Sequence, residues 1–192
     1  MQRYVAFLRG INLGKRRPPM SRLKALFEEL GFTEVATFIA SGNLIFSSRI
    51  KDAGRLESRI AGHLAASLGY GVDTFVRTTE EVARIGRTRV FPEEGREGIT
   101  IHVGFLQQEL APETARRLAA VRTKDDEFRV TGREYHWLCR IRTPDSKVWT
   151  LPEIKSLRLP TSTMRNISSI RKLVAQHIDS ARASPVTSAR RP

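Results

Sequence analysis

Short apolar runs alternate with amphipathic stretches along the first 77 residues of the chain. The runs are rich in β-branched and aromatic residues, which favour strands over helices. Four such runs predict strands, at residues 4–9, 35–40, 44–46 and 72–77. Between them, apolar residues spaced three or four apart predict one helix from Ser21 and another from about Asp52. The resulting order, β-α-β-β-α-β, is that of the ferredoxin-like split βαβ plan.

The second half of the chain repeats this order in a weaker form. The pattern predicts a strand at 99–106, a helix at 112–121, a hairpin at 128–141 and a helix at 166–178. Residues 142–160 carry too little pattern for an assignment. We therefore expect an α+β protein with two ferredoxin-like (α-β plait) domains. The expected division is 1–86 for the first domain, 87–98 for a linker, 99–179 for the second, degenerate domain, and 180–192 for a disordered tail.

Two polar clusters are expected to meet at one end of the first sheet. In the split βαβ plan the first two strands are parallel and the third lies between them, so the first strand ends beside the hairpin tip. The clusters comprise Arg9, Gly10, Asn12, Gly14 and Lys15 after the first strand, and Ser41, Gly42 and Asn43 in the hairpin. Cations and glycine N–H groups bind anions, while serine and asparagine orient ligands by hydrogen bonds. The alternative is that the glycines only turn the chain and the cations are solvated.

A third polar motif, Thr163-Met164-Arg165-Asn166, follows in the second half. Arg165 and Asn166 are expected to join the site from the second domain. The alternative is that Asn166 only caps the next helix and Arg165 is exposed. The Gly10 loop is not a nucleotide P-loop, because one residue too few separates its glycines and Arg16 replaces the metal-binding Ser or Thr. We expect a small-ligand or anion-binding protein, with enzymatic activity, cofactor and oligomeric state left open.

The net charge of +13 favours a different function. Basic residues exceed acidic ones mainly in residues 1–50 and 151–192, and such an excess is the usual footprint of a nucleic-acid partner. A compositional bias towards arginine is the alternative explanation. The rings that an RNA-binding sheet would use are interpreted as core: Tyr4, Phe7, Tyr135 and Trp137. A structural or partner-binding protein is a third alternative, and would expose an apolar patch.

Several kinds of site are not expected. Cys139 is the only cysteine, so we interpret it as a packing residue and expect no disulfide. The four histidines lack the spacing of a metal motif. The run Asp125 to Glu127 is interpreted as the start of a solvated strand. The chain has no run of about 18 apolar residues and does not begin with a signal-peptide pattern, so we expect a cytoplasmic protein without a membrane span.

Three motifs together resemble a known family. They are residues 4–14, Ser41-Gly42-Asn43 followed by Leu44-Ile45-Phe46, and Thr163 to Asn166. In order and spacing they are similar to the family called domain of unknown function 1697, over about residues 2–178. The resemblance implies a bacterial conserved hypothetical protein with two α-β plait domains, and it implies no activity or cofactor. The chain departs from the family pattern at Lys15, which directly follows Gly14, at Ile167 to Ser169, and over 142–160.

Overall fold

The N-terminal half of the chain forms one four-stranded antiparallel sheet. The computed structural model describes residues 1–11, 17–39 and 42–180. The elements of this half are β1 (Gln2–Arg9), α1 (Met20–Glu29), β2 (Thr33–Phe38), β3 (Asn43–Ser48), α2 (Ala53–Leu68) and β4 (Asp73–Thr78). The strand order is β2-β3-β1-β4, and each neighbouring pair is antiparallel. The third strand therefore lies between the first two, as the sequence predicts.

The C-terminal half forms a second sheet with the corresponding order. Its elements are β5 (Thr100–Phe105), α4 (Pro112–Ala120), β6 (Asp126–Thr131), β7 (Glu134–Cys139), α5 (Pro152–Ser156) and β8 (Thr163–Asn166). The order is β6-β7-β5-β8, again antiparallel throughout. The weakly patterned residues form two short 3-10 turns, at 143–145 and 148–150, and then α5. The molecule is thus a mixed α+β protein with two antiparallel sheets flanked by helices.

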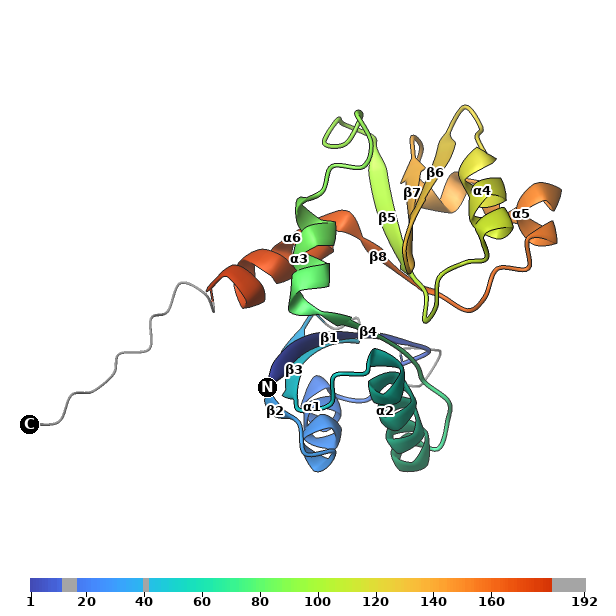
Figure 1. Ribbon diagram of the computed structural model, residues 1–192. Helices are drawn as coiled ribbons and strands as arrows, with labels where there is room; N and C mark the ends of the chain where they lie inside the picture. Colours follow the sequence, from blue (N-terminus) through green and yellow to red (C-terminus); the bar gives the residue numbers. More distant parts are fainter. Residues whose placement is uncertain (12–16, 40–41, 181–192) are drawn as a thin grey trace, which may run out of the picture.

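Helices cover the outer face of each sheet, while the inner faces meet across a shared core (Figure 1). Side chains alternate along β1. Tyr4, Ala6 and Leu8 pack against the α1 and α2 side. Val5 and Phe7 face the second sheet, where the Phe7 ring stacks on Phe105 with centroids 4.0 Å apart. The four rings expected in the core are buried.

Two further helices lie side by side where the sheets meet (Figure 1). They are α3 (Thr79–Arg87) and α6 (Ile167–Leu173), which continues as a π-helical turn at Val174–Asp179. A capping box begins α3, because the Thr78 hydroxyl accepts from the Glu81 N–H and the Glu81 carboxylate accepts from the Thr78 N–H. Both helices contribute to the core between the sheets. Among the described residues, no helix is long and apolar enough to cross a bilayer.

The run Asp125 to Glu127 does not begin a solvated strand, which corrects the expectation above. Asp126 and Glu127 are buried. The Asp126 carboxylate accepts hydrogen bonds from the Trp137 indole and the Ser146 hydroxyl, both at 2.8 Å. Glu127 forms ion pairs with three arginines, Arg122, Arg129 and Arg140. These partners compensate the desolvation of the carboxylates.

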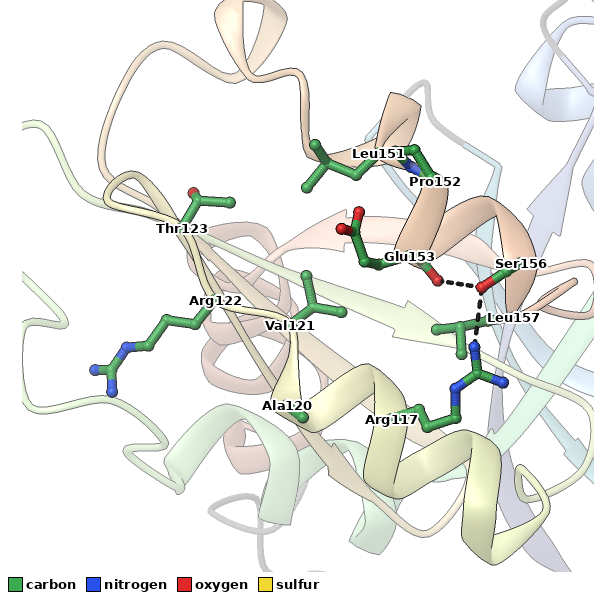
Figure 2. A pocket seen from close by; sticks show the side chains of 10 residues that line it. All are labelled: Arg117, Ala120, Val121, Arg122, Thr123, Leu151, Pro152, Glu153, Ser156 and Leu157. Atoms are coloured by element: carbon green, nitrogen blue, oxygen red, sulfur yellow. Dashed lines mark hydrogen bonds between the residues drawn. The ribbon is translucent and has the colours of Figure 1, made fainter.

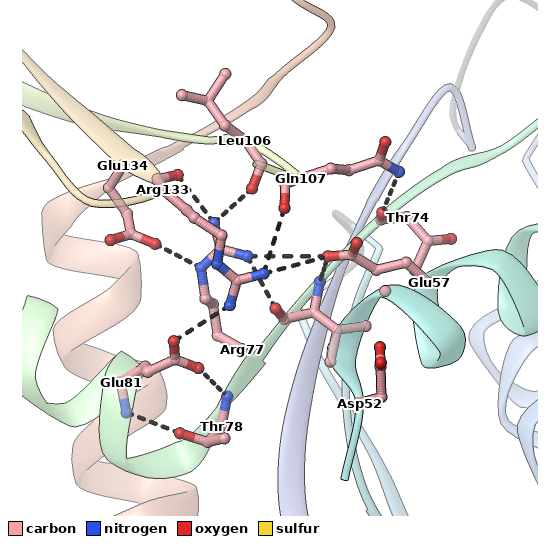
Figure 3. Close-up of polar contacts among 12 residues, drawn as sticks. Asp52, Glu57, Thr74, Arg77, Thr78, Glu81, Leu106, Gln107, Arg133 and Glu134 are labelled. Carbon is pink, nitrogen blue, oxygen red and sulfur yellow. Dashed lines mark hydrogen bonds and ion pairs between the residues drawn. The ribbon is translucent and has the colours of Figure 1, made fainter. Parts of the chain in front are cut away.

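A buried ion network joins the two halves across their inner faces (Figure 3). Arg77 in β4 is fully buried and donates to the Glu134 carboxylate of β7 at 2.5 Å. Its other N–H groups donate to the backbone carbonyls of Val76, Leu106 and Arg133. Burial lowers the pKa of the Arg77 guanidinium, whereas Glu134 counteracts this effect. The network therefore fixes the end of β4 to the β6–β7 hairpin.

Another buried polar group on the inner face is His136 in β7. It is buried, and among the described residues neither ring nitrogen has a hydrogen-bond partner. Burial lowers the pKa of the imidazole to about 4, although the charge of Glu94 acts in the opposite direction. The folded protein therefore holds His136 neutral at pH values where an unfolded histidine is protonated.

We expect His136 to make stability depend on pH between about 4 and 6.5. As pH falls from 7.5 to 5, the unfolded chain takes up a proton that the folded protein excludes. The free energy of unfolding should therefore fall by about 2 kcal/mol more in the wild type than in His136→Leu. Urea unfolding of both proteins across this pH range measures the difference. Parallel pH profiles would show that His136 titrates normally in the folded state.

Candidate functional site

The end of β1 and the tip of the β2–β3 hairpin lie against each other. The Leu8 N–H donates to the Gly42 carbonyl at 2.8 Å, and Phe7 pairs with Asn43 in the sheet register. Gly42 has a positive φ of 72°, and a Cβ there would lie 2.9 Å from Ile11 Cγ2. Any larger residue at position 42 would therefore separate the hairpin from the strand end.

The backbone around this junction is unusual at three positions. Gly10 and Gly42 have φ values of 84° and 72°, in the region that glycine favours. Ile39, at the end of β2, has a φ of 55° and an exposed side chain. A β-branched residue rarely adopts this conformation, and such strain is typical of functional turns.

Asn43 links the hairpin to the second half of the protein. Its side chain is buried, and its amide donates to the Phe38 carbonyl at 3.2 Å. Its carbonyl oxygen accepts from Arg165 Nε at 2.6 Å. These contacts position Asn43 as a bridge between β3 and β8.

Arg165 in β8 reaches both polar clusters of the N-terminal half. It donates to the Leu8 carbonyl at 2.9 Å as well as to Asn43, and to Thr163 and Met164 within its own strand. The guanidinium lies over the Phe7 ring, 5.7 Å from its centroid. Burial lowers its pKa to about 10. Arg165 is therefore half-buried and connects three segments, so the alternative that it is simply exposed is wrong.

Arg9 projects from the same face of β1 as Phe7, because the two residues are two positions apart in the strand. It forms an exposed ion pair with Asp73 at 2.8 Å. Its charge also acts on Tyr135, where it opposes the rise in phenol pKa that burial causes. The Tyr135 hydroxyl lies 2.9 Å from the Ser162 hydroxyl. Arg9 and Arg165 thus lie on the inner faces of the two sheets at the junction, whereas the Tyr135 ring packs in the outer core of the second sheet.

Asn166, the last predicted residue that the structure describes, does not join this arrangement. Asn166 follows Arg165, but its side-chain oxygen accepts from the N–H and the hydroxyl of Ser168 and so caps α6. The alternative, that Asn166 caps the next helix, is confirmed, and among the described contacts its side chain makes none with the junction. Four predicted residues lie outside the described residues: Asn12, Gly14, Lys15 and Ser41.

The hydroxyl pair of Tyr135 and Ser162, on the outer side of the second sheet, was not predicted from the sequence. Tyr135 and Ser162 come from β7 and from the segment before β8, and neither lies in a polar motif. Within the described parts of the chain, no three His, Cys, Asp or Glu side chains are grouped closely enough to hold a metal ion.

The chain is thus a two-sheet α+β protein with a cationic junction between its halves. It belongs to the family described as Protein of unknown function (DUF1697), whose model matches residues 1–136. This confirms the resemblance seen in the first two motifs, while the motif at 163–166 lies beyond the matched residues. The family description assigns no activity.

A solved structure supports the same assignment of fold. The conserved bacterial protein SP0830 from Streptococcus pneumoniae has a TM-score of 0.69 to this chain and is 20% identical in sequence. The alignment covers 92% of this chain and 99% of that protein. At this identity the likeness shows the fold alone. No curated protein matches the chain in sequence.

Proposed function

We propose that the protein binds a small anionic molecule at the junction of β1, the β2–β3 hairpin and β8. The observation that carries this proposal is the position of Arg165, which bonds to Leu8 and Asn43 from 157 and 122 residues away in the chain. Partial burial of a guanidinium that bonds to three segments has a desolvation cost, and forming a turn does not require that cost. Such a guanidinium is the kind of preorganised cation that anion sites use.

The charges at the junction support an anionic ligand. Arg9 lies on the inner face of the first sheet, where it pairs with Asp73, and Arg165 reaches it from the facing inner face of the second sheet and lies over the Phe7 ring. The acceptors that the described contacts bring to Arg165 are neutral oxygens. An anion beside Arg165 would favour its charged form, against the effect of burial.

We further propose that each half is a ferredoxin-like domain, with the first at 1–86, a linker at 87–98 and the second at 99–179. The orders β2-β3-β1-β4 and β6-β7-β5-β8 support this division, because in both sheets the third strand lies between the first two. The proposed site then lies between two domains, which is a frequent position for small-molecule sites.

Thermal unfolding with a ligand panel tests the proposed function. The panel contains inorganic phosphate, phosphorylated sugars, nucleoside monophosphates and short oligonucleotides. A ligand at about 100 times its dissociation constant stabilises the folded protein by about 2.7 kcal/mol, which raises the midpoint measurably. We expect a small anion to produce this shift. A response to oligonucleotides alone, falling steeply with salt, would favour nucleic-acid binding by the basic termini instead.

The residue-level test compares Arg9→Gln with Arg22→Gln. Both arginines form exposed ion pairs, with Asp73 and Glu29, and both are about half exposed. Neither substitution should change stability by more than about 0.5 kcal/mol. Arg9→Gln should weaken binding of the anion about tenfold or more, because a charge-assisted hydrogen bond is lost, whereas Arg22→Gln should not. Equal affinities in the two variants would refute the site.

A further inference from the structure

The helix layer over the second sheet is incomplete. In the N-terminal half, α2 has 16 residues between β3 and β4 and buries Leu56, Ile60 and Leu64 against the sheet. The helix in the corresponding place between β7 and β8 is α5, which has 5 residues. It ends shortly before Pro160, which disfavours a helical residue ahead of it. The shorter helix covers less of the outer face of the sheet.

A cavity of about 790 Å³ lies between α4 and α5 (Figure 2). This volume is within the range of small-molecule sites. Val121, Leu151 and Leu157 line it with apolar surface, and all three belong to or pack against the outer core of this half. The cavity can therefore remove an apolar group from water.

Three charged residues line the cavity: Arg117, Arg122 and Glu153. Arg122 pairs with Glu127 at 2.7 Å and projects away from the other two (Figure 2). Arg117 and Glu153 form no ion pair with each other among the described contacts. Arg117 on α4 extends across to α5, where it donates to the Ser156 hydroxyl at 2.9 Å. The Glu153 carboxylate projects into the space from α5 (Figure 2). Among the described contacts, no hydrogen bond or ion pair engages that carboxylate. One guanidinium and one carboxylate beside an apolar wall are complementary to a molecule with an anionic end, a cationic end and an apolar body.

From this arrangement we infer that the α4–α5 cavity binds an apolar amino acid or a short apolar peptide as its zwitterion. The ligand carboxylate is held by Arg117 and the ligand ammonium by Glu153. The apolar side chain lies against Val121, Leu151 and Leu157. This site shares no residue with the β1–β8 junction, so it does not rest on the proposed function.

Isothermal titration with four probes tests the inference. L-Leucine carries both charges, isocaproate only the anion, isoamylamine only the cation, and tri-leucine separates the charges along a peptide. We expect L-leucine or tri-leucine to bind, and the two singly charged analogues to bind at least about tenfold more weakly. Which zwitterion binds more tightly distinguishes a free amino acid from a peptide. Absence of binding at millimolar concentration, or isocaproate binding as tightly as leucine, overturns the inference.

Single substitutions test which charged group of the ligand Arg117 and Glu153 each bind. Arg117→Gln should reduce the affinity for the zwitterion to that of isoamylamine, which lacks the carboxylate. Glu153→Gln should reduce it to that of isocaproate, which lacks the ammonium. Arg116→Gln is the control, because Arg116 is the neighbouring residue on α4, is mostly exposed and does not line the cavity. Its affinity should equal that of the wild type. Arg9→Gln should also leave this binding intact, which separates failure here from failure of the junction site.

Discussion

Replacing Arg77 by methionine is expected to lower the free energy of unfolding by about 4 kcal/mol. Arg77 has no exposed surface, and its guanidinium bonds to Glu134 at 2.5 Å and lies 3.9 Å from Glu57. Methionine fills much of the volume but leaves the buried Glu134 carboxylate without its counter-charge, and leaves Glu57 with Arg133 alone, also at 3.9 Å. Burial already raises the pKa of Glu57 even with Arg77 present. Urea unfolding at neutral pH measures the loss.

The double variant Arg77→Met, Glu134→Gln separates a lost charge pair from lost packing. Removing the uncompensated carboxylate should restore part of the stability, because a neutral amide is less costly to bury. Arg116→Gln provides the comparison at an exposed ion pair, with Glu113, and should change stability by about 0.5 kcal/mol or less. A similar small effect for Arg77→Met would mean that the buried network contributes little to holding the halves together.

Gly104→Ala is the second substitution with a large expected effect, about 3 kcal/mol of destabilisation. Gly104 in β5 pairs directly with Tyr135 in β7, and the Tyr135 ring lies flat over it. An added Cβ would lie 2.0 Å from the ring, which cannot shift freely because Tyr135 is buried and its hydroxyl contacts Ser162. The alanine variant must therefore displace the ring or separate the strands.

Gly62→Ala is the matched control for this effect. Gly62 lies within α2, and nothing lies within 4 Å of the position that its Cβ would occupy. Alanine is the better helix former, so this variant should be about 0.5–1 kcal/mol more stable than the wild type.

In a double-mutant cycle, Tyr135→Ala should cost less in the Gly104→Ala background than alone, because the clash is then absent. Strict additivity would contradict the proposed ring contact.

The element order and much of the core could be predicted from sequence periodicity. The alternation in β1 assigns Tyr4 to one face and Phe7 to the other, and both faces prove to be buried. The buried charges could not be predicted this way. Arg77 depends on Glu57 and Glu134, which are 20 and 57 residues away, so no local pattern contains the network. Glu127 was misassigned for a different reason: its partners Arg122 and Arg129 are close in sequence, but its burial results from packing that the local pattern does not show.

The candidate site was predicted in part. The split βαβ topology correctly placed the end of β1 beside Gly42, because strand order alone determines that contact. Arg165 was expected from the second half, and the structure brings it to Asn43. The contacts of Arg165 with Asn43 and Leu8 depend on how the two halves pack, which a single sequence does not specify. The α4–α5 cavity arises from the short α5 helix, in a stretch without readable periodicity.

The most direct test of the central claim, that the junction binds a small anion, is a phosphate titration followed by nuclear magnetic resonance of the nitrogen-labelled protein. The account predicts that the Arg165 Nε–H signal and the amide signals of Gly10 and Gly42 shift together and saturate with one dissociation constant. Saturable shifts confined to other arginines, or shifts at the junction that never saturate, would contradict it.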